Sequence, residues 1–200
     1  MGMAFAEPIT LRGEHAALEP LAAGHASDLQ EAARDGDLWK LWYTSVVPPE
    51  RMDAEIERRL ALMRAGTMLP FAVIDPASKR AVGMTTYMNI DAANRRVEIG
   101  STWYAKRVQR TALNTECKLM LLTHAFETLK CIAVEFRTHW MNQLSRDAIL
   151  RLGAKQDGVL RNHAIASDGS YRDTVVFSII ESEWPAVKSH LRFKLASGRA

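Results

Sequence analysis

The segment over residues 98–154 constrains the fold more than any other part of the chain. It reads as a strand ending near Tyr104, a basic turn over residues 106–112, a helix opening at about Asn114, then a second strand and a second helix. A strand that leads through a cationic turn into a helix suits a phosphate group. The first N–H groups of a helix lack intrahelical partners, and the helix dipole attracts negative charge. We therefore predict an anionic cofactor at this turn.

On either side of this segment, the hydrophobic pattern switches repeatedly between the helical and the extended period. Apolar residues at helical spacing predict helices over residues 24–34, 50–64, 114–129, 145–152 and 183–193. Apolar and β-branched runs bounded by turn residues predict strands over residues 9–21, 69–75, 80–90, 96–104, 131–138, 159–166 and 171–180. Strands with helices between only some of them indicate a mixed α/β sheet, and 200 residues suit one domain with its own core.

Charge and cysteine content exclude several classes of protein. The formal net charge is +3, and the basic residues are spread along the chain, which argues against a nucleic-acid binder. Cys117 and Cys131 have no metal-type spacing, so we expect buried, reduced thiols in an intracellular protein without a metal site. Residues 1–10 lack the pattern of a secretory signal, and no stretch approaches the roughly 20 apolar residues of a membrane span. We expect a cytoplasmic protein with no membrane partner.

A set of short motifs runs in a fixed order through the chain. They are Glu98-Ile99-Gly100, Trp103-Tyr104, Asn114-Thr115-Glu116, Asn142-x-x-Ser145, Gly153-Ala154, Gly158-Val159-Leu160-Arg161-Asn162-His163, Arg172-Asp173-Thr174-Val175-Val176-Phe177-Ser178 and Glu183-Trp184-Pro185. Their combination resembles the GNAT N-acetyltransferases, and more narrowly the RimJ/RimL-like branch of ribosomal-protein N-terminal acetyltransferases. The resemblance implies a single GNAT domain over residues 1–200, with a mixed, mostly antiparallel central sheet and flanking helices.

The same resemblance implies a reaction. The co-substrate would be acetyl-CoA or another acyl-CoA, and the acceptor a primary amine such as a protein N-terminus or a small-molecule amine. The acyl group would pass directly between them in a ternary complex. A homodimer is compatible with the family but has no support in the residues themselves.

The phosphate turn departs from the family pattern at one position. The pattern is Gln/Arg-x-x-Gly-x-Gly/Ala, and residues 107–112 match it at Arg107 and Ala112 but carry Arg110 in place of the glycine. Glycine suits backbone with unusual dihedrals or a close approach to a ligand, so Arg110 could block the pyrophosphate. It could equally add a cation that pairs with it. If it blocks, the chain is a degenerate GNAT-fold CoA-binding or regulatory module without catalysis.

The resemblance also implies the cofactor contacts. The strand segment 102–104 would pair through its backbone with the pantetheine arm, and the turn would hold the pyrophosphate. The implied contacts are Thr102, Trp103, Tyr104, Arg107, Val108, Gln109, Arg110, Thr111, Ala112, Asn114 and Thr115. In the later helix, Asn142 would contact the cofactor or a water, and Ser145 would donate a proton to the leaving thiolate. Plain N-capping is the alternative for both residues.

Glu98 is the candidate general base, acting directly or through water. Strand alternation places it on the face opposite its apolar neighbours Val97 and Ile99. Partial burial there would raise its pKa toward a useful range. The alternative is a structural ion pair with Arg95, Arg96 or another arginine, and the sequence leaves both possibilities open.

Aromatic residues near the N-terminus supply the candidate acceptor contacts. By resemblance, Trp39, Trp42 and Tyr43 line the acceptor site, since aromatic rings give a pocket area and shape; core packing is the alternative. The remaining expected substrate contacts are Tyr87 and, on the final hairpin, Arg161, His163 and Asp173.

Overall fold

The computed structural model describes residues 5–44, 46–166 and 168–198. Within these ranges eight strands form one sheet in the order β1-β2-β3-β4-β5-β6-β8-β7. The strands are β1 (Leu11–Arg12), β2 (Ala17–Pro20), β3 (Met68–Asp75), β4 (Arg80–Asp91), β5 (Arg96–Tyr104), β6 (Ala133–His139), β7 (Lys155–Ile165) and β8 (Tyr171–Ile180). The helices are α1 (Ala26–Arg34), α2 (Met52–Arg64), α3 (Ala112–Thr123), α4 (Gln143–Arg151) and α5 (Trp184–Ala196). The predicted mixed α/β fold is confirmed.

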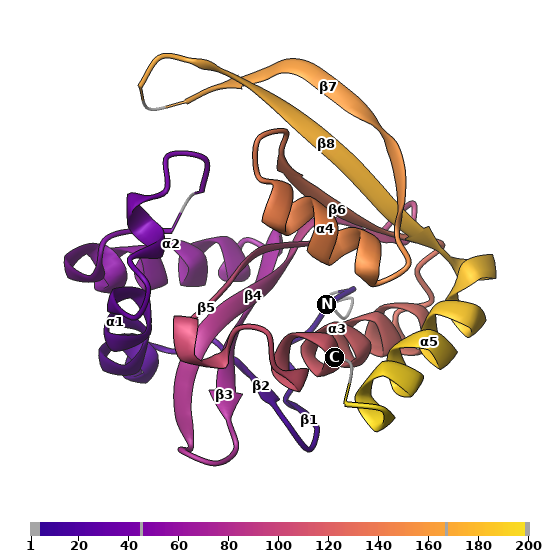
Figure 1. Cartoon of the computed structure of the whole chain (residues 1–200), viewed down its shortest axis with the longest axis horizontal. Coiled ribbons are helices and arrows are strands. Elements are labelled where there is room, and N and C mark those ends of the chain that lie inside the picture. The colour runs from indigo at the N-terminus through magenta and orange to yellow at the C-terminus, as the bar shows by residue number, and fades with distance from the viewer. Residues whose placement is uncertain (1–4, 45, 167, 199–200) are drawn as a thin grey trace.

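Only one pair of neighbouring strands in the described sheet is parallel, and it is short. β5 and β6 pair from Arg96 with Ala133 to Glu98 with Glu135, whereas the other neighbours run antiparallel. α3 supplies the crossover that a parallel pair requires. Beyond this contact the sheet opens, and Figure 1 shows β1 to β5 and the group β6, β8 and β7 as two diverging parts.

Helices cover both faces of the sheet. Thr86 of β4 points to α2, where Arg59 donates a hydrogen bond to its hydroxyl at 2.9 Å. Tyr87, the next residue, points the other way, and its hydroxyl donates to the carbonyl of Leu121 in α3. We call these sides the α2 face and the α3 face; α5 packs against α3 on the second. Alternation along β4 and β5 therefore decides on which side each functional side chain lies.

Some element boundaries differ from the sequence prediction for local reasons. α3 begins at Ala112 rather than near Asn114, because the Thr111 hydroxyl caps it by accepting the N–H of Leu113 at 3.3 Å. The regular helix ends at Thr123 and continues as a π-helical turn, His124–Thr128. β7 begins at Lys155, since its pairing with β8 extends further than its apolar residues indicate. No helix in the described ranges is both long and apolar enough to cross a membrane.

Candidate active site

The candidate site lies where β5 and β6 part. Past Glu98 and Glu135 each strand pairs on one side only, β5 with β4 and β6 with β8. The backbone groups of residues 99–104 that face the opening therefore have no strand partner there within the described chain. An unpaired strand edge of this kind can bind an extended ligand as an additional strand.

β5 carries a β-bulge at the mouth of this opening. The register against β4 shifts between Gly100 and Trp103, and Ser101 between them has a φ of 48°. Left-handed backbone is uncommon for a residue other than glycine, and bulges re-aim side chains beside active sites. Because of the extra residue, Thr102 points to the α3 face, although regular alternation would have placed it with Glu98.

Glu98 is buried on the α2 face beside the bulge, with 6% of its surface exposed. Asn89 donates a hydrogen bond to Oε2 at 2.7 Å, and Nε of Arg137 lies 3.6 Å from the same oxygen. Burial raises the pKa of Glu98 above its ordinary value, while the Asn89 bond and the charge of Arg137 oppose the shift. Glu98 is thus a carboxylate with a raised pKa, and only one of its two oxygens, Oε2, accepts a hydrogen bond from a described residue.

The other oxygen, Oε1, lies over Gly100. A Cβ at Gly100 would lie 2.9 Å from Oε1 and 2.8 Å from the sulfur of Met88, so a side chain there would displace the carboxylate. Beside Glu98 opens a pocket of about 480 Å³, lined by Asn89, Asp91, Asn94, Arg96, Val97, Glu98, Ile132, Glu135 and Arg137. Of the arginines predicted as alternative partners, Arg96 pairs with Glu135, and the cation beside Glu98 is Arg137.

The turn between β5 and α3 is held from α1. The carboxylate of Asp35 accepts both the backbone N–H and the guanidinium of Arg107, each at 3.1 Å. The side chain of Gln109 donates to the Tyr104 carbonyl at 2.9 Å. Arg110 is exposed and has a φ of 59°, the left-handed backbone for which the family pattern uses glycine. Arg107 is therefore engaged within the fold, whereas Arg110 has no ion pair among the described residues.

Asn142 and Ser145 stand at the start of α4, which follows the end of β6 that has parted from β5. The Asn142 side-chain oxygen accepts the N–H of Ser145 at 3.1 Å, so it is the N-cap of α4. The capping alternative therefore describes this oxygen correctly. The Asn142 amide nitrogen and the Ser145 hydroxyl make no hydrogen bond to the residues that the structure describes, and both side chains are half-buried.

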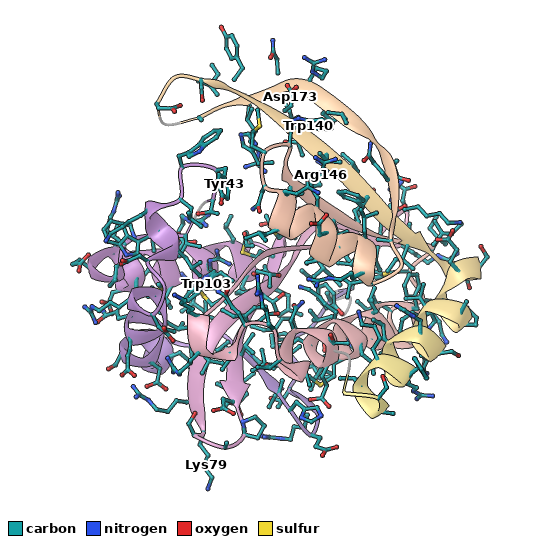
Figure 2. The ribbon with its side chains drawn as sticks, viewed as in Figure 1. Tyr43, Lys79, Trp103, Trp140, Arg146 and Asp173 are labelled. Carbon is teal, nitrogen blue, oxygen red and sulfur yellow. The ribbon has the colours of Figure 1, made fainter. Side chains whose placement is uncertain are left out.

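The aromatic segment between α1 and α2 reaches the end of β6. Trp42 is 57% exposed, and its ring meets His139 edge-on at 5.0 Å and Tyr43 at 5.6 Å between centroids. Figure 2 shows Tyr43 on this segment, with Trp140 and Asp173 of the opposing part of the sheet across from it. Trp39 is half-buried, and its indole N–H lacks a partner among the described residues. Trp42 is thus not a core residue, and it lies next to the opening.

The hairpin residues predicted for the acceptor hold one another. Arg161 donates to Asp173 at 2.5 Å, and the backbone N–H of Asn162 donates to the same carboxylate at 2.8 Å. His163 is exposed, with Nδ1 3.1 Å from the Thr174 hydroxyl. These contacts fix the irregular part of the β7–β8 ladder. His163 remains accessible to a ligand, whereas the ion pair of Arg161 and Asp173 stabilises the hairpin itself.

Several predicted contacts have side chains that are buried in the fold. Tyr87 is fully buried and bonded to α3, so the structure places it in the core and does not bring it to the acceptor side. Thr115 is buried in α3. Trp103 and Tyr104 are also buried, so only their backbone can meet a ligand.

A buried lysine that the sequence reading missed lies beside the bulge. Lys118 of α3 is 6% exposed, and its Nζ donates to the hydroxyls of Thr102 at 2.8 Å and Thr85 at 3.3 Å. It forms no ion pair with any residue in the described ranges. Burial lowers its pKa to about 8. Helix α3, which follows the basic turn, is thereby tied to β5 next to Ser101.

Other contributors were missed for a common reason. Asn89 and Arg137 meet Glu98 through the register of β4 and β6 with β5. Asp35 reaches the turn from the end of α1, 72 residues before Arg107. Arg137 had a usable signal, because alternation along the predicted strand 131–138 places it on one face with Glu135. Asn89 had none, since its bond to Glu98 depends on its own left-handed backbone, with a φ of 45°.

Comparison with known proteins decides the family. The profile of the acetyltransferase (GNAT) domain matches residues 16–155, which is well over half of the chain and runs from β2 through α4. The chain belongs to the GNAT acetyltransferase family. A GCN5-related N-acetyltransferase from Brucella melitensis is 31% identical to this GNAT chain, with a TM-score of 0.86 over 95% of this chain and 86% of that one.

Two further GNAT comparisons bear on the branch. YdaF of Bacillus subtilis (strain 168), provisionally named a ribosomal N-acetyltransferase, is 32% identical over 106 residues, or 53% of this chain. The match spans 57% of YdaF, little more than half of that relative. RimJ of Mycobacterium smegmatis, solved with CoA-disulfide, shares the fold at 22% identity and a TM-score of 0.76, covering 92% of this chain and 90% of RimJ. The name of YdaF agrees with the RimJ/RimL-like resemblance, and RimJ shows the shared fold.

Proposed function

We propose that this GNAT protein transfers an acyl group, acetyl in the simplest case, from acyl-CoA to a primary amine by direct transfer in a ternary complex. The observation that carries the proposal is the opening between β5 and β6. It brings an unpaired strand edge, a β-bulge and a buried basic carboxylate together. The acyl-CoA supplies an activated thioester, and the protein's part is to position it, exclude water and move protons.

The groups along β5 and the following turn suit an extended anionic thioester. Residues 102–104 offer backbone donors and acceptors at the unpaired edge of β5. The side chains of Trp103 and Tyr104 are buried, so these two residues can meet a ligand only through their backbone. At the turn, Arg110 provides a cation next to the start of α3, where the helix dipole favours phosphate. Arg110 has a left-handed φ, so the backbone of this turn has the conformation that glycine would supply at the same position of the family pattern. We therefore propose that Arg110 aids CoA binding; RimJ, which shares this fold, was solved with CoA-disulfide.

Glu98 is the proposed general base. Its Oε2 is held by Asn89, while Oε1 has no hydrogen-bond partner among the described residues and lies over Gly100 beside the bulge. Its raised pKa makes Oε1 a better proton acceptor for an ammonium or for an intervening water. The neutral amine then attacks the thioester carbon, and the C–S bond breaks to release the thiolate. The Ser145 hydroxyl is the proposed proton donor to the thiolate, and it recovers a proton from the attacking nitrogen. The amide nitrogen of Asn142 is the proposed contact to cofactor or water.

The proposal extends to the setting of the protein. We infer that residues 1–200 act as one domain in the cytoplasm and that two copies form a homodimer. Both cysteines are buried and unpaired, which suits a reducing compartment. Sedimentation analysis of the purified chain measures the oligomeric state.

An acetyl-CoA turnover screen tests the activity. Thiol release is followed with a panel of amines that includes amino acids, polyamines, aminoglycosides and peptides of varied N-terminus. We expect at least one amine to be consumed, and Glu98→Gln to lower kcat at least about 100-fold while acetyl-CoA affinity stays within about threefold. Glu57→Gln, an exposed change on α2, is the matched control. Absence of acetyl-CoA binding by calorimetry, together with no turnover, would overturn the proposed enzyme and favour a module without catalysis.

A further inference from the structure

Arg172 of β8 is a half-buried cation without a counter-ion. Its Nε donates to the Thr174 hydroxyl at 3.2 Å, and it forms no ion pair with any residue that the structure describes. The other arginines around Glu98 differ in this respect, since Arg137 and Arg96 both pair with Glu135. A half-buried guanidinium whose Nη groups have no partner loses hydration free energy, and an anionic ligand that pairs with it would offset this loss. Arg172 is therefore a candidate anion contact.

His139 presents a second unsatisfied donor nearby. It is 6% exposed, and its Nδ1 accepts the backbone N–H of Met141 at 3.0 Å. Because Nδ1 accepts this bond, the neutral ring carries its proton on Nε2. Burial and the charge of Arg172 favour the neutral ring by lowering the pKa of His139, against the opposing charge of Asp173. That Nε2 is buried and has no hydrogen-bond partner among the described residues. An orphaned buried donor of this kind calls for a ligand group.

Strand register places both donors on the same side as the base. Glu135 pairs with Glu98 and lies on the α2 face; His139, four residues on, lies on that face too and pairs with Thr174. Arg172, two residues from Thr174, follows the same alternation. Its positive charge is close enough to act on both Glu98 and His139. One surface thus carries a carboxylate that can accept a proton and, on the same side, two hydrogen-bond donors that can hold an anion.

We propose that the acceptor is a free amino acid, with its amine at Glu98 and its carboxylate on Arg172 and the Nε2–H of His139. This inference rests on the proposed acyltransfer and names the substrate class of the same site. A zwitterion matches the arrangement of charges, because its ammonium faces the anionic Glu98 and its carboxylate faces the cation. Trp42, whose ring touches His139 and is largely exposed, would cover the bound side chain. A peptide N-terminus offers only a neutral carbonyl in place of the carboxylate.

Matched substrates test this assignment. Each of the common L-amino acids and its C-terminal amide is assayed with acetyl-CoA, next to a set of dipeptides. We expect kcat/KM for the best acid to exceed that of its own amide at least about tenfold, since a charge-assisted pair is lost with the amide. Arg172→Met should remove this preference by lowering the rate with the acid and leaving the rate with the amide. Arg172→Lys keeps the positive charge and should therefore retain part of the preference for the acid over its amide.

Arg12→Met serves as the control, because Arg12 is exposed on β1 at the other edge of the sheet. It should leave the preference unchanged. Turnover of amides or peptides in preference to the acids would overturn the inference while the proposed acyltransfer stands. The inference would also be overturned if a folded Arg172→Met protein still preferred amino acids to their amides. If no amine of any kind is acetylated, the proposed function itself fails, and the inference with it.

Discussion

Replacement of the buried Lys118 by methionine should stabilise the protein. Lys118 is buried, and among the described residues its Nζ has no acidic partner and hydrogen-bonds only to the hydroxyls of Thr85 and Thr102. Methionine has similar length and carries no charge to desolvate. The two threonine hydroxyls remain satisfied in the variant, because their oxygens already lie 2.8 Å apart.

The magnitude follows from the pKa of Lys118, which burial lowers from 10.5 to about 8. Each unit corresponds to about 1.4 kcal/mol, so the buried charge costs roughly 3 kcal/mol of stability at pH 7. Below pH 8 both the folded and the unfolded chain hold the proton, and the cost is present in full. Between pH 8 and 10.5 only the unfolded chain holds it, so this contribution makes native stability rise with pH. The lost hydrogen bonds offset about 1 to 2 kcal/mol of the gain.

Urea denaturation at pH 7 and at pH 10 measures both effects. We expect Lys118→Met to raise the free energy of unfolding by about 1 to 2 kcal/mol at pH 7, and the difference from the native chain to shrink or reverse at pH 10. Lys155→Met, which removes an exposed lysine from β7, should change stability by less than about 1 kcal/mol at both values. A variant that is less stable at pH 7, with a pH-independent difference, would refute the reasoning and point to a charged partner for Lys118.

Three further changes test other parts of the account. Glu116→Gln should cost about 2 to 4 kcal/mol in denaturation, because the carboxylate accepts the backbone N–H groups of residues 14, 15 and 16 at 2.9, 2.6 and 2.7 Å; a loss below 1 kcal/mol contradicts this. Gly100→Ala should lower kcat at least tenfold by displacing Glu98, whereas Gly24→Ala, with nothing within 4 Å of the new Cβ, should be silent; equal rates in the two would remove the steric argument. Arg110→Gly should relieve about 1 kcal/mol of backbone strain and yet weaken acetyl-CoA binding in calorimetry. Tighter binding would mean that Arg110 obstructs the cofactor.

The sequence predicts the frame of this molecule well, because hydrophobic period and turn residues are local signals. β5 and β8 have the predicted bounds, and the apolar stripe of α3 identifies the crossover helix. Alternation correctly places Glu98 on the face opposite Val97 and Ile99, whereas its role as a base stays a prediction. The bulge at Ser101 was not, since one residue with left-handed backbone leaves no mark on the hydrophobic pattern.

Contacts between distant segments account for the rest. Alternation along a strand separates two faces but does not tell which helix covers each. Tyr87, predicted as an acceptor contact, therefore lies against α3 in the core instead. The pairing of Asn89 with Glu98 and the isolation of Arg172 depend on register between strands. Lys118 shows the limit most clearly, because a lysine within a helix normally faces solvent, and only packing reveals that this one does not.

A crystal structure with bound CoA is the most direct test of the central claim, that the opening between β5 and β6 is the cofactor seat. The account predicts the pantetheine arm along residues 102–104, bonded to their backbone, with the pyrophosphate at residues 107–112 and the thiol on the side of Ser145. It also predicts that Glu98 stays within reach of the thiol end. CoA bound elsewhere on the chain, or crystals that exclude it at saturating concentration, would contradict the account.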